Sequence, residues 1–212
     1  MEASLKDLEK MEKLRRERSL VLIKPDGVMR KLVGEIITRF ERKGLKIIAI
    51  RMLVPPQNLV EEHYVNSEEW LLESGTRTFN SYKERGVEPP LKTPREFGMY
   101  TRRKLMDSLG AGPVVALVLE GPHVIEVVRK MRGSTSPLLA DVGTIGFDYS
   151  LDSYEVADAG DWPIKNIIHA SDSPENADRE IKIWFDESDI VDYHAAEDEV
   201  LFTKDWYGKK SR

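Results

Sequence analysis

The sequence predicts an α+β fold, a ferredoxin-like βαββαβ sandwich with an antiparallel sheet and an inserted helical hairpin. Three observations predict it: apolar runs of strand length alternate with segments of helical period, turn residues separate them, and two excursions interrupt the alternation. In chain order we expect strand, helix, strand, excursion, strand, helix, excursion, strand and helix, with the helices on one face of the sheet. With 212 residues, the chain is long enough for one sizeable core and an elaborated insertion.

The first half of the pattern begins with a predicted strand at residues 18–23, where Ser-Leu-Val-Leu-Ile follows an arginine. Lys-Pro-Asp-Gly at 24–27 ends this strand and turns the chain. Apolar residues of helical period follow from 33 to 40, and Gly44 stands where a C-cap belongs. The next predicted strand, 45–54, stops at two consecutive prolines.

The second half contains a nearly all-apolar run at 114–119, which predicts a central strand. Apolar spacing at 123–131 predicts a helix, and residues 166–170 are the fourth predicted strand. Ser173 is a favoured N-cap, and a proline and a glutamate follow it directly. These residues predict a helix from about 174 to 185.

The insertion lies at about residues 67–109. Gly86, Pro89, Pro90 and Pro94 divide it into two predicted helices joined by a loop. Basic and acidic side chains nearly balance within it, so it does not have the charge of a nucleic-acid-binding arm.

Residues 1–17 form a charged leader with apolar residues at about helical spacing, which predicts a short amphipathic helix. Residues 18–212 are predicted to form a single domain. Hydrophobic residues make up 41% of the chain and charged residues 33%, as in globular proteins with a highly charged surface. The net charge of −5 argues against nucleic acid as a partner, and no apolar run approaches the roughly 20 residues of a membrane helix. The absence of cysteine fits a reducing cytoplasm.

The most informative segment is 166–173, Asn-Ile-Ile-His-Ala-Ser-Asp-Ser, in which His169 follows a short apolar run. Glu180 falls on a mostly apolar face of the helix that comes next, where a carboxylate is costly without a partner. His169 is the natural partner. A carboxylate on one imidazole nitrogen selects the tautomer and leaves the other nitrogen free to act as a nucleophile.

The other histidines, His63, His123 and His194, are interpreted as ordinary core or surface residues. Metal ligation is a weaker alternative for all four histidines, because the chain lacks cysteine and the histidines do not have recognisable ligand spacing.

The segment 166–173 resembles the active-site stretch of nucleoside diphosphate kinases, in which the histidine is phosphorylated during turnover. Lys-Pro-Asp-Gly at 24–27 is similar to the opening motif of that family. The resemblance extends from about residue 18 to the C-terminus except for 67–109, so the chain resembles a long variant with an expanded nucleotide-side hairpin. The family order of strands and helices resembles the predicted fold, which agrees with the motif.

The resemblance assigns roles to individual residues. It implies that the catalytic residues are His169 as nucleophile, Glu180 and Ser171 as its supports, Lys24 at the terminal phosphate, and Tyr64 beside the nucleophile.

The resemblance also implies a nucleotide-binding set. Its members are Lys24, Trp70, Arg129, Thr135 and Asn166, with Arg129 and Thr135 on the phosphates and Asn166 on the sugar.

In the family, an aromatic residue of the hairpin stacks on the base. Trp70 is favoured here because it follows Tyr64 at a similar distance, but Phe79 and Tyr82 are alternatives. Pro137 matches the proline of a loop used in subunit contacts.

One departure concerns the loop at 143–148. The family has Gly-Thr-Ile-Arg-Gly-Asp-Phe there and its arginine holds phosphate, whereas this chain reads Gly-Thr-Ile-Gly-Phe-Asp, with Gly146 in place of the arginine. Losing a preorganised cation opposite the transferring phosphate lowers the rate. The sequence does not choose among four possible substitutes: Arg132, Lys165, Arg102 and Arg103.

The implied function is that of a nucleoside diphosphate kinase, which passes the γ-phosphoryl group of a nucleoside triphosphate to a nucleoside diphosphate through a phosphohistidine on His169. The implied cofactor is Mg²⁺, carried by the nucleotide without a protein metal site. The chain has no Gly-x-x-x-x-Gly-Lys-Ser/Thr loop, which disfavours a P-loop kinase. The implied assembly is a homo-oligomer, a hexamer or a tetramer, in the cytoplasm.

Two alternatives stay open. The missing arginine at Gly146 makes a catalytically weakened nucleotide-binding or scaffolding relative conceivable, although His169, Glu180 and Lys24 argue against it. The second alternative is a nucleic-acid-binding protein, and the excess of acidic over basic residues argues against it.

Overall fold

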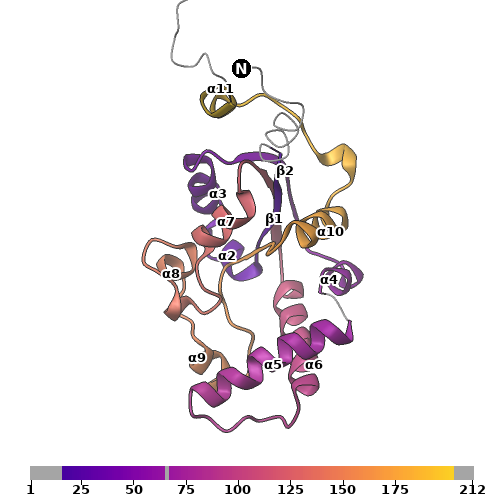
Figure 1. Cartoon of the computed structure of the whole chain (residues 1–212), viewed down its shortest axis with the longest axis vertical. Coiled ribbons are helices and arrows are strands. Elements are labelled where there is room, and N and C mark those ends of the chain that lie inside the picture. The colour runs from indigo at the N-terminus through magenta and orange to yellow at the C-terminus, as the bar shows by residue number, and fades with distance from the viewer. Residues whose placement is uncertain (1–15, 65–66, 203–212) are drawn as a thin grey trace, which may run out of the picture.

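A four-stranded antiparallel sheet forms the centre of the protein, seen in a computed structural model that describes residues 16–64 and 67–202 (Figure 1). The predicted leader at 1–17 lies outside these residues, except for its last two. The strand order is β2-β3-β1-β4. The strands are β1 (Arg18–Ile23), β2 (Lys46–Leu53), β3 (Val114–Glu120) and β4 (Ile168–Ala170). The α+β fold class predicted from the sequence is confirmed.

The fourth strand is shorter than the predicted 166–170, and the prediction was wrong for its first two residues. Ile167 has a φ of +72°, a conformation that β-branched residues rarely adopt and that cannot continue a strand. The Asp26 carboxylate and the Lys24 backbone hold the residue there: Asp26 Oδ2 accepts from the Ile167 amide at 3.0 Å, and the Lys24 amide donates to the Ile167 carbonyl at 2.8 Å. The turn therefore joins the ends of β1 and β4.

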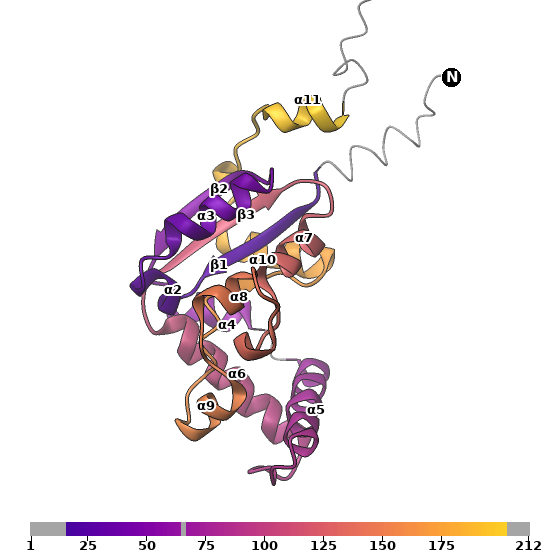
Figure 2. The same cartoon turned by 90° about the vertical axis from the view of Figure 1, so that its left-hand side faces the viewer.

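Helices cover both faces of the sheet, whereas the sequence predicted helices on one face only. Helices α3 (Val33–Arg42) and α7 (Val124–Arg132) pack on one face, as expected for the βαββαβ unit. The other face is covered by α4 (Gln57–His63), α10 (Pro174–Trp184) and the C-terminal end of α6 (Pro94–Gly110). In Figure 1 the sheet is seen close to edge-on, with α3 and α7 on one side and α4 and α10 on the other, and Figure 2 shows its strands side by side.

The alternation of buried residues along β1 explains the two-sided cover. Val21 and Ile23 belong to the core cluster under α3 and α7, while Leu20 and Leu22 belong to the cluster under α4 and α10. All four side chains are fully buried. Because both faces are apolar, the strand reads as a continuous hydrophobic run, and the sequence alone did not show that a second layer was needed.

The insertion forms a helical hairpin of α5 (Glu68–Glu84) and α6, in agreement with the predicted pair of helices. Thr93 starts α6 with a reciprocal capping box to Glu96. The two helices approach closely at Gly75 and Gly98: an added Cβ at Gly75 would lie 1.7 Å from the Pro94 carbonyl oxygen. The hairpin extends from the end of the sheet opposite α11 (Figures 1 and 2).

Short elements complete the described part of the chain. They are α2 (Pro25–Met29), η1 (Pro137–Leu139), α8 (Ile145–Tyr149), α9 (Tyr154–Ala159), η2 (Glu187–Asp189) and α11 (Ala196–Phe202). Within residues 16–64 and 67–202, none of the helices has both the length and the hydropathy needed to span a bilayer.

Candidate active site

His169 lies on β4, where it pairs with Leu22 of β1, and 22% of its side chain is exposed. Its Nε2 atom lies 3.0 Å from Oε2 of Glu180. Ser171 Oγ donates to the same carboxylate oxygen at 2.7 Å and accepts from the Leu20 amide at 3.1 Å. The predicted partnership of His169, Glu180 and Ser171 is therefore present, and Ser171 fixes the carboxylate to the backbone of the central sheet.

Glu180 lies in the second turn of α10, which begins after the Ser173 N-cap. Only 5% of Glu180 is exposed. Burial alone raises the pKa of a carboxyl, but the neighbouring His169 charge and the hydrogen bonds from His169 and Ser171 outweigh it and lower the pKa of Glu180 to about 2. An ionised carboxylate only accepts hydrogen bonds, so whenever the His169 ring is neutral, Nε2 carries its proton and Nδ1 has the free lone pair.

His63 was interpreted as an ordinary residue, but the structure places it against the nucleophile. The rings of His63 and His169 are 4.6 Å apart in an edge-to-face arrangement. Trp184 Nε1 donates to His63 Nδ1 at 3.3 Å, and burial lowers the pKa of His63 to about 3. His63 is therefore a neutral core histidine that also packs on the site. Its position directly before Tyr64 was the signal that could have identified it.

A cavity of about 220 Å³ opens in front of His169. We call it the His169 pocket. Most of the predicted site residues line it, although they come from distant parts of the chain: Lys24, Tyr64, Trp70, Thr135, Asn166, His169 and Glu180. Ser171 lies behind Glu180 and does not line the pocket.

Lys24 and Asn166 are joined within the pocket. Lys24 is 5% exposed, and its ammonium donates to Oδ1 of Asn166. Nδ2 of Asn166 in turn donates to the carbonyl of Thr135 at 2.8 Å. Burial lowers the pKa of Lys24. The turn at Ile167 thus brings the Asn166 amide, the loop that carries Thr135 and the buried Lys24 ammonium together beside His169.

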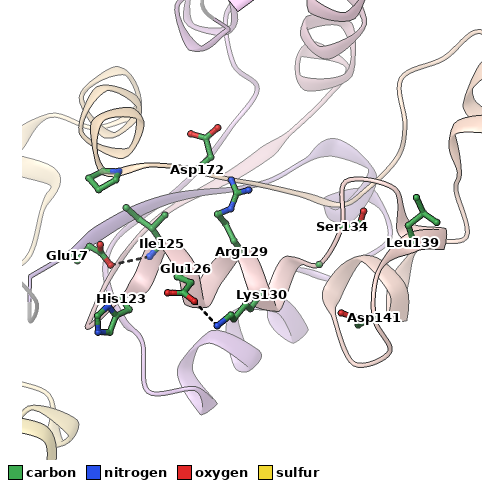
Figure 3. Close-up of a pocket in the computed structure, with 12 residues that line it drawn as sticks. Glu17, His123, Ile125, Glu126, Arg129, Lys130, Ser134, Leu139, Asp141 and Asp172 are labelled. Carbon is green, nitrogen blue, oxygen red and sulfur yellow. Dashed lines mark hydrogen bonds and ion pairs between the residues drawn. The ribbon is translucent and has the colours of Figure 1, made fainter. Parts of the chain in front are cut away.

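Within the predicted nucleotide-binding set, Arg129 is the residue that does not line the His169 pocket. It is exposed on α7 and lines a neighbouring groove of about 630 Å³, where its side chain extends toward Asp172 (Figure 3). Asp172 lines both cavities, so the groove adjoins the His169 pocket. Arg132, one turn further along α7, lines the His169 pocket in its place.

The structure separates the three aromatic residues that competed for base stacking. Trp70 lines the His169 pocket. Phe79 and Tyr82 instead pack on Phe97 of α6, with ring centroids 5.7 and 5.5 Å apart. The latter two pack within the hairpin, and Trp70 is the one of the three that lines the pocket.

Among the described residues, His63, His169 and Glu180 form one group whose possible ligand atoms lie within 4.8 Å of one another. Nδ1 of His63 already accepts from Trp184, and Glu180 accepts from His169 and Ser171. Mg²⁺ prefers several oxygen ligands in octahedral geometry, which this nitrogen-rich and internally bonded group does not provide.

Comparison with known proteins shows extensive similarity. A family model described as nucleoside diphosphate kinase matches residues 17–80 and 98–190. The chain is 43% identical to a nucleoside diphosphate kinase from Pyrobaculum aerophilum over 180 residues, which are 83% of this chain and 98% of that protein. It is 40% identical to one from Methanothermobacter thermautotrophicus over 186 residues, 88% of this chain and 98% of that protein.

Two solved structures are similar in fold. The crystal structure of an NDP kinase from Pyrobaculum aerophilum has a TM-score of 0.80 and 41% identity, covering 84% of this chain and all of that one. A nucleoside-diphosphate kinase from Borrelia burgdorferi, a transition-state mimic with bound vanadate and ADP, has a TM-score of 0.70 and 33% identity, covering 88% of this chain and 96% of that one. The family model includes residues 67–80 and 98–109, so the prediction that the resemblance leaves out 67–109 was wrong for most of that segment; residues 81–97, around the loop between α5 and α6, are unmatched.

Proposed function

The chain belongs to the nucleoside diphosphate kinase family, and we propose that His169 is the residue that carries the phosphoryl group between its two nucleotides. The protein is an enzyme of this class, transferring the terminal phosphoryl group of a nucleoside triphosphate to a nucleoside diphosphate. The observation that carries the proposal is the 3.0 Å contact between His169 Nε2 and Glu180, which leaves Nδ1 as the free nitrogen.

The reaction has two half-reactions at one site. In the first, the Nδ1 lone pair of His169 attacks the γ-phosphorus, the bond from phosphorus to the bridging oxygen breaks, and the nucleoside diphosphate leaves with that electron pair. In the second, a terminal phosphate oxygen of another nucleoside diphosphate attacks the phosphohistidine and returns the lone pair to Nδ1. Positive charge that develops on the ring is stabilised by the Glu180 carboxylate, which is already ionised and oriented by Ser171.

The other pocket residues bind the nucleotide. The Lys24 ammonium contacts the phosphates and the sugar hydroxyl, Asn166 contacts the sugar, and Thr135 contacts the phosphates. Trp70 stacks on the base, which gives little selection among bases because each base has a stacking face. We assign Arg129, which lines the adjoining groove, to phosphate oxygens away from the reacting phosphorus atom.

An enzyme of this class uses a divalent metal ion, and we assign Mg²⁺. The pocket fits an ion that comes with the nucleotide: Asp172 is a lining carboxylate, and Glu180 is occupied by His169 and Ser171. When bound, Mg²⁺ neutralises the phosphate oxygens during transfer. We further propose a cytoplasmic homo-oligomer, a hexamer or a tetramer, for which the resemblance of the Pro137 loop to a subunit-contact loop is the support.

Incubation with γ-³²P-ATP and Mg²⁺, without acceptor, tests the proposal. The wild type should become labelled on a bond that is acid-labile and alkali-stable, and any nucleoside diphosphate should remove the label. His169→Ala should not become labelled, whereas His194→Ala, which changes an exposed histidine outside the pocket, should label as the wild type does. Equal labelling of His169→Ala would refute the assignment, and an unlabelled wild type would favour a scaffolding relative.

A further inference from the structure

The His169 pocket contains a cation that the nucleotide-binding set above does not include. Arg132 is the last residue of α7 and lines the pocket beside Lys24. We propose that the Arg132 guanidinium binds the transferring phosphoryl group and replaces the arginine that the loop lacks at Gly146. This inference rests on the proposed phosphohistidine mechanism and names a further residue that would touch the substrate.

Local hydrogen bonds direct Arg132 into the pocket. The helix ends at Gly133, whose φ of +84° turns the chain back. Arg132 Nε donates to the Gly133 carbonyl at 3.2 Å, and Nη2 lies 3.4 Å from Thr135 Oγ1. The Thr135 carbonyl accepts from Asn166, which binds the Lys24 ammonium. Arg132, Thr135, Asn166 and Lys24 therefore form one continuous hydrogen-bonded wall of the pocket.

The charges on this wall attract an anion. Burial contributes most to lowering the pKa of Lys24, the charges of Asp26 and Asp152 act in the opposite direction, and the positive charge of Arg132 adds to the lowering. The two cations are therefore close enough to repel each other. In the part of the chain that the structure describes, neither Lys24 nor Arg132 has a carboxylate within ion-pair distance. Asp26 and Asp152 act on Lys24, and Asp172 acts on Arg132, from beyond ion-pair distance. A polyphosphate bound between the two cations would relieve their mutual repulsion.

The other candidates for the missing arginine are occupied elsewhere. The Lys165 ammonium lies 4.4 Å from the centre of the Trp162 ring, and the Arg103 guanidinium 5.5 Å from that of Tyr100. Arg102 donates to the Tyr64 carbonyl at 3.1 Å. None of these three cations lines the His169 pocket.

Arg179 does line the pocket, but it has a structural role. Its two terminal nitrogens donate to the carbonyls of Glu62 and His63 at 3.1 and 3.2 Å. The same guanidinium lies 3.6 Å from Glu180. Arg179 thus connects α10 to α4, and its charge is compensated by an ion pair with Glu180, whereas Arg132 forms no ion pair among the described residues.

The location of Gly146 supports the exchange of one arginine for another. A Cβ added at Gly146 would lie 3.0 Å from the Arg132 carbonyl oxygen, which means that the two backbones are in direct contact. An arginine at position 146 would therefore branch from nearly the same place as Arg132, which lines the His169 pocket. The cation needed opposite the phosphate can therefore come from α7 instead of from the α8 segment.

The test compares Arg132→Ala and Arg132→Lys with Arg103→Ala, a matched control that removes a guanidinium outside the pocket. Single-turnover labelling by γ-³²P-ATP measures the phosphorylation rate, and calorimetry measures the Kd of Mg-ADP. We expect Arg132→Ala to slow phosphorylation about 100-fold, the lower end of the loss found when one preorganised donor is removed. Arg132→Lys should recover only part of the rate, because it keeps the charge but not the planar fork.

Chemical rescue separates substrate contact from a structural role. Guanidinium ion at tens of millimolar should raise the phosphorylation rate of Arg132→Ala and not that of Arg103→Ala, while circular dichroism shows both variants folded. A rate for Arg132→Ala within about threefold of Arg103→Ala would overturn the inference, as would a slow variant that guanidinium does not rescue. An unlabelled wild type would overturn the phosphohistidine mechanism itself, so failure of the two proposals can be distinguished.

Discussion

Replacing Glu180 by glutamine tests how much the carboxylate behind the nucleophile contributes to phosphoryl transfer. The substitution keeps the size of the side chain and one acceptor oxygen but removes the charge that faces His169 at 3.0 Å and Ser171 at 2.7 Å. A hydrogen bond to a charged group contributes about 1.5–3 kcal/mol, against about 0.5–1.5 for a neutral one. Glu180 is 5% exposed, so water screens the lost charge little, and we take the loss as about 2 kcal/mol. That corresponds to a phosphorylation rate about 30-fold slower.

The assay is single-turnover labelling of Glu180→Gln by γ-³²P-ATP, with Asp178→Asn as the control. Asp178 is exposed on the same helix, so its substitution removes the same charge without touching the pocket. A Glu180→Gln rate equal to that of Asp178→Asn would refute the reasoning, because it would mean that the carboxylate does not act on the ring.

The Glu180→Gln substitution should also change how the free energy of unfolding depends on pH. The pKa of Glu180 is lowered from 4.5 to about 2 in the folded protein. The carboxylate therefore contributes stability above pH 4.5, and this contribution is lost as the pH falls toward 2. Between pH 4.5 and pH 2, urea unfolding should show a steeper loss of stability for the wild type than for Glu180→Gln. Parallel curves would show that the carboxyl is not stabilised in its ionised form.

Three further predictions concern the pocket wall and the hairpin. Burial lowers the pKa of Lys24 below the ordinary lysine value of 10.5, so its charge is lost at a lower pH than that of a free lysine. Mg-ADP affinity measured by calorimetry should therefore begin to fall below pH 10.5 in the wild type but not in Lys24→Arg. Trp70→Ala should weaken Mg-ADP binding about tenfold, the expected contribution of one stacked base, whereas Phe79→Ala should lower Tm and leave the Kd unchanged; equal effects on Kd would contradict the assignment. Gly75→Ala should destabilise the protein by about 1–3 kcal/mol in urea unfolding, because its Cβ would collide with the α6 backbone. Gly34→Ala, on an open helix face, is the control that should not lose stability.

The regular elements were predictable because each has a local signal. The first three strands and helices α7 and α10 begin and end within one residue of their predicted bounds or at them. The failure at residues 166–167 has a nonlocal cause. Two isoleucines favour a strand, but the Asp26 carboxylate, which is 141 positions away in sequence, accepts from the Ile167 amide and stabilises a left-handed conformation there. The residues around positions 166 and 167 give no sign of that contact.

The arrangement of α7 also shows why the sequence could not choose the phosphate-binding arginine. Arg129 and Arg132 are one turn apart, and helical spacing alone places both near the same face. What separates them is the end of the helix. Arg129 lies within the regular helix and extends into the outer groove, whereas Arg132 is followed by the Gly133 turn and bonds back to the loop that it precedes. A side chain at the terminus is thus directed by the loop after it, and the loop that carries Thr135 is the one that faces His169. Because Arg129 extends into the outer groove, Arg129→Ala should weaken Mg-ADP binding by a few fold and leave the single-turnover rate at saturating ATP near that of the wild type. A rate loss for Arg129→Ala equal to that of Arg132→Ala would show that the two side chains act together on the transferring phosphate.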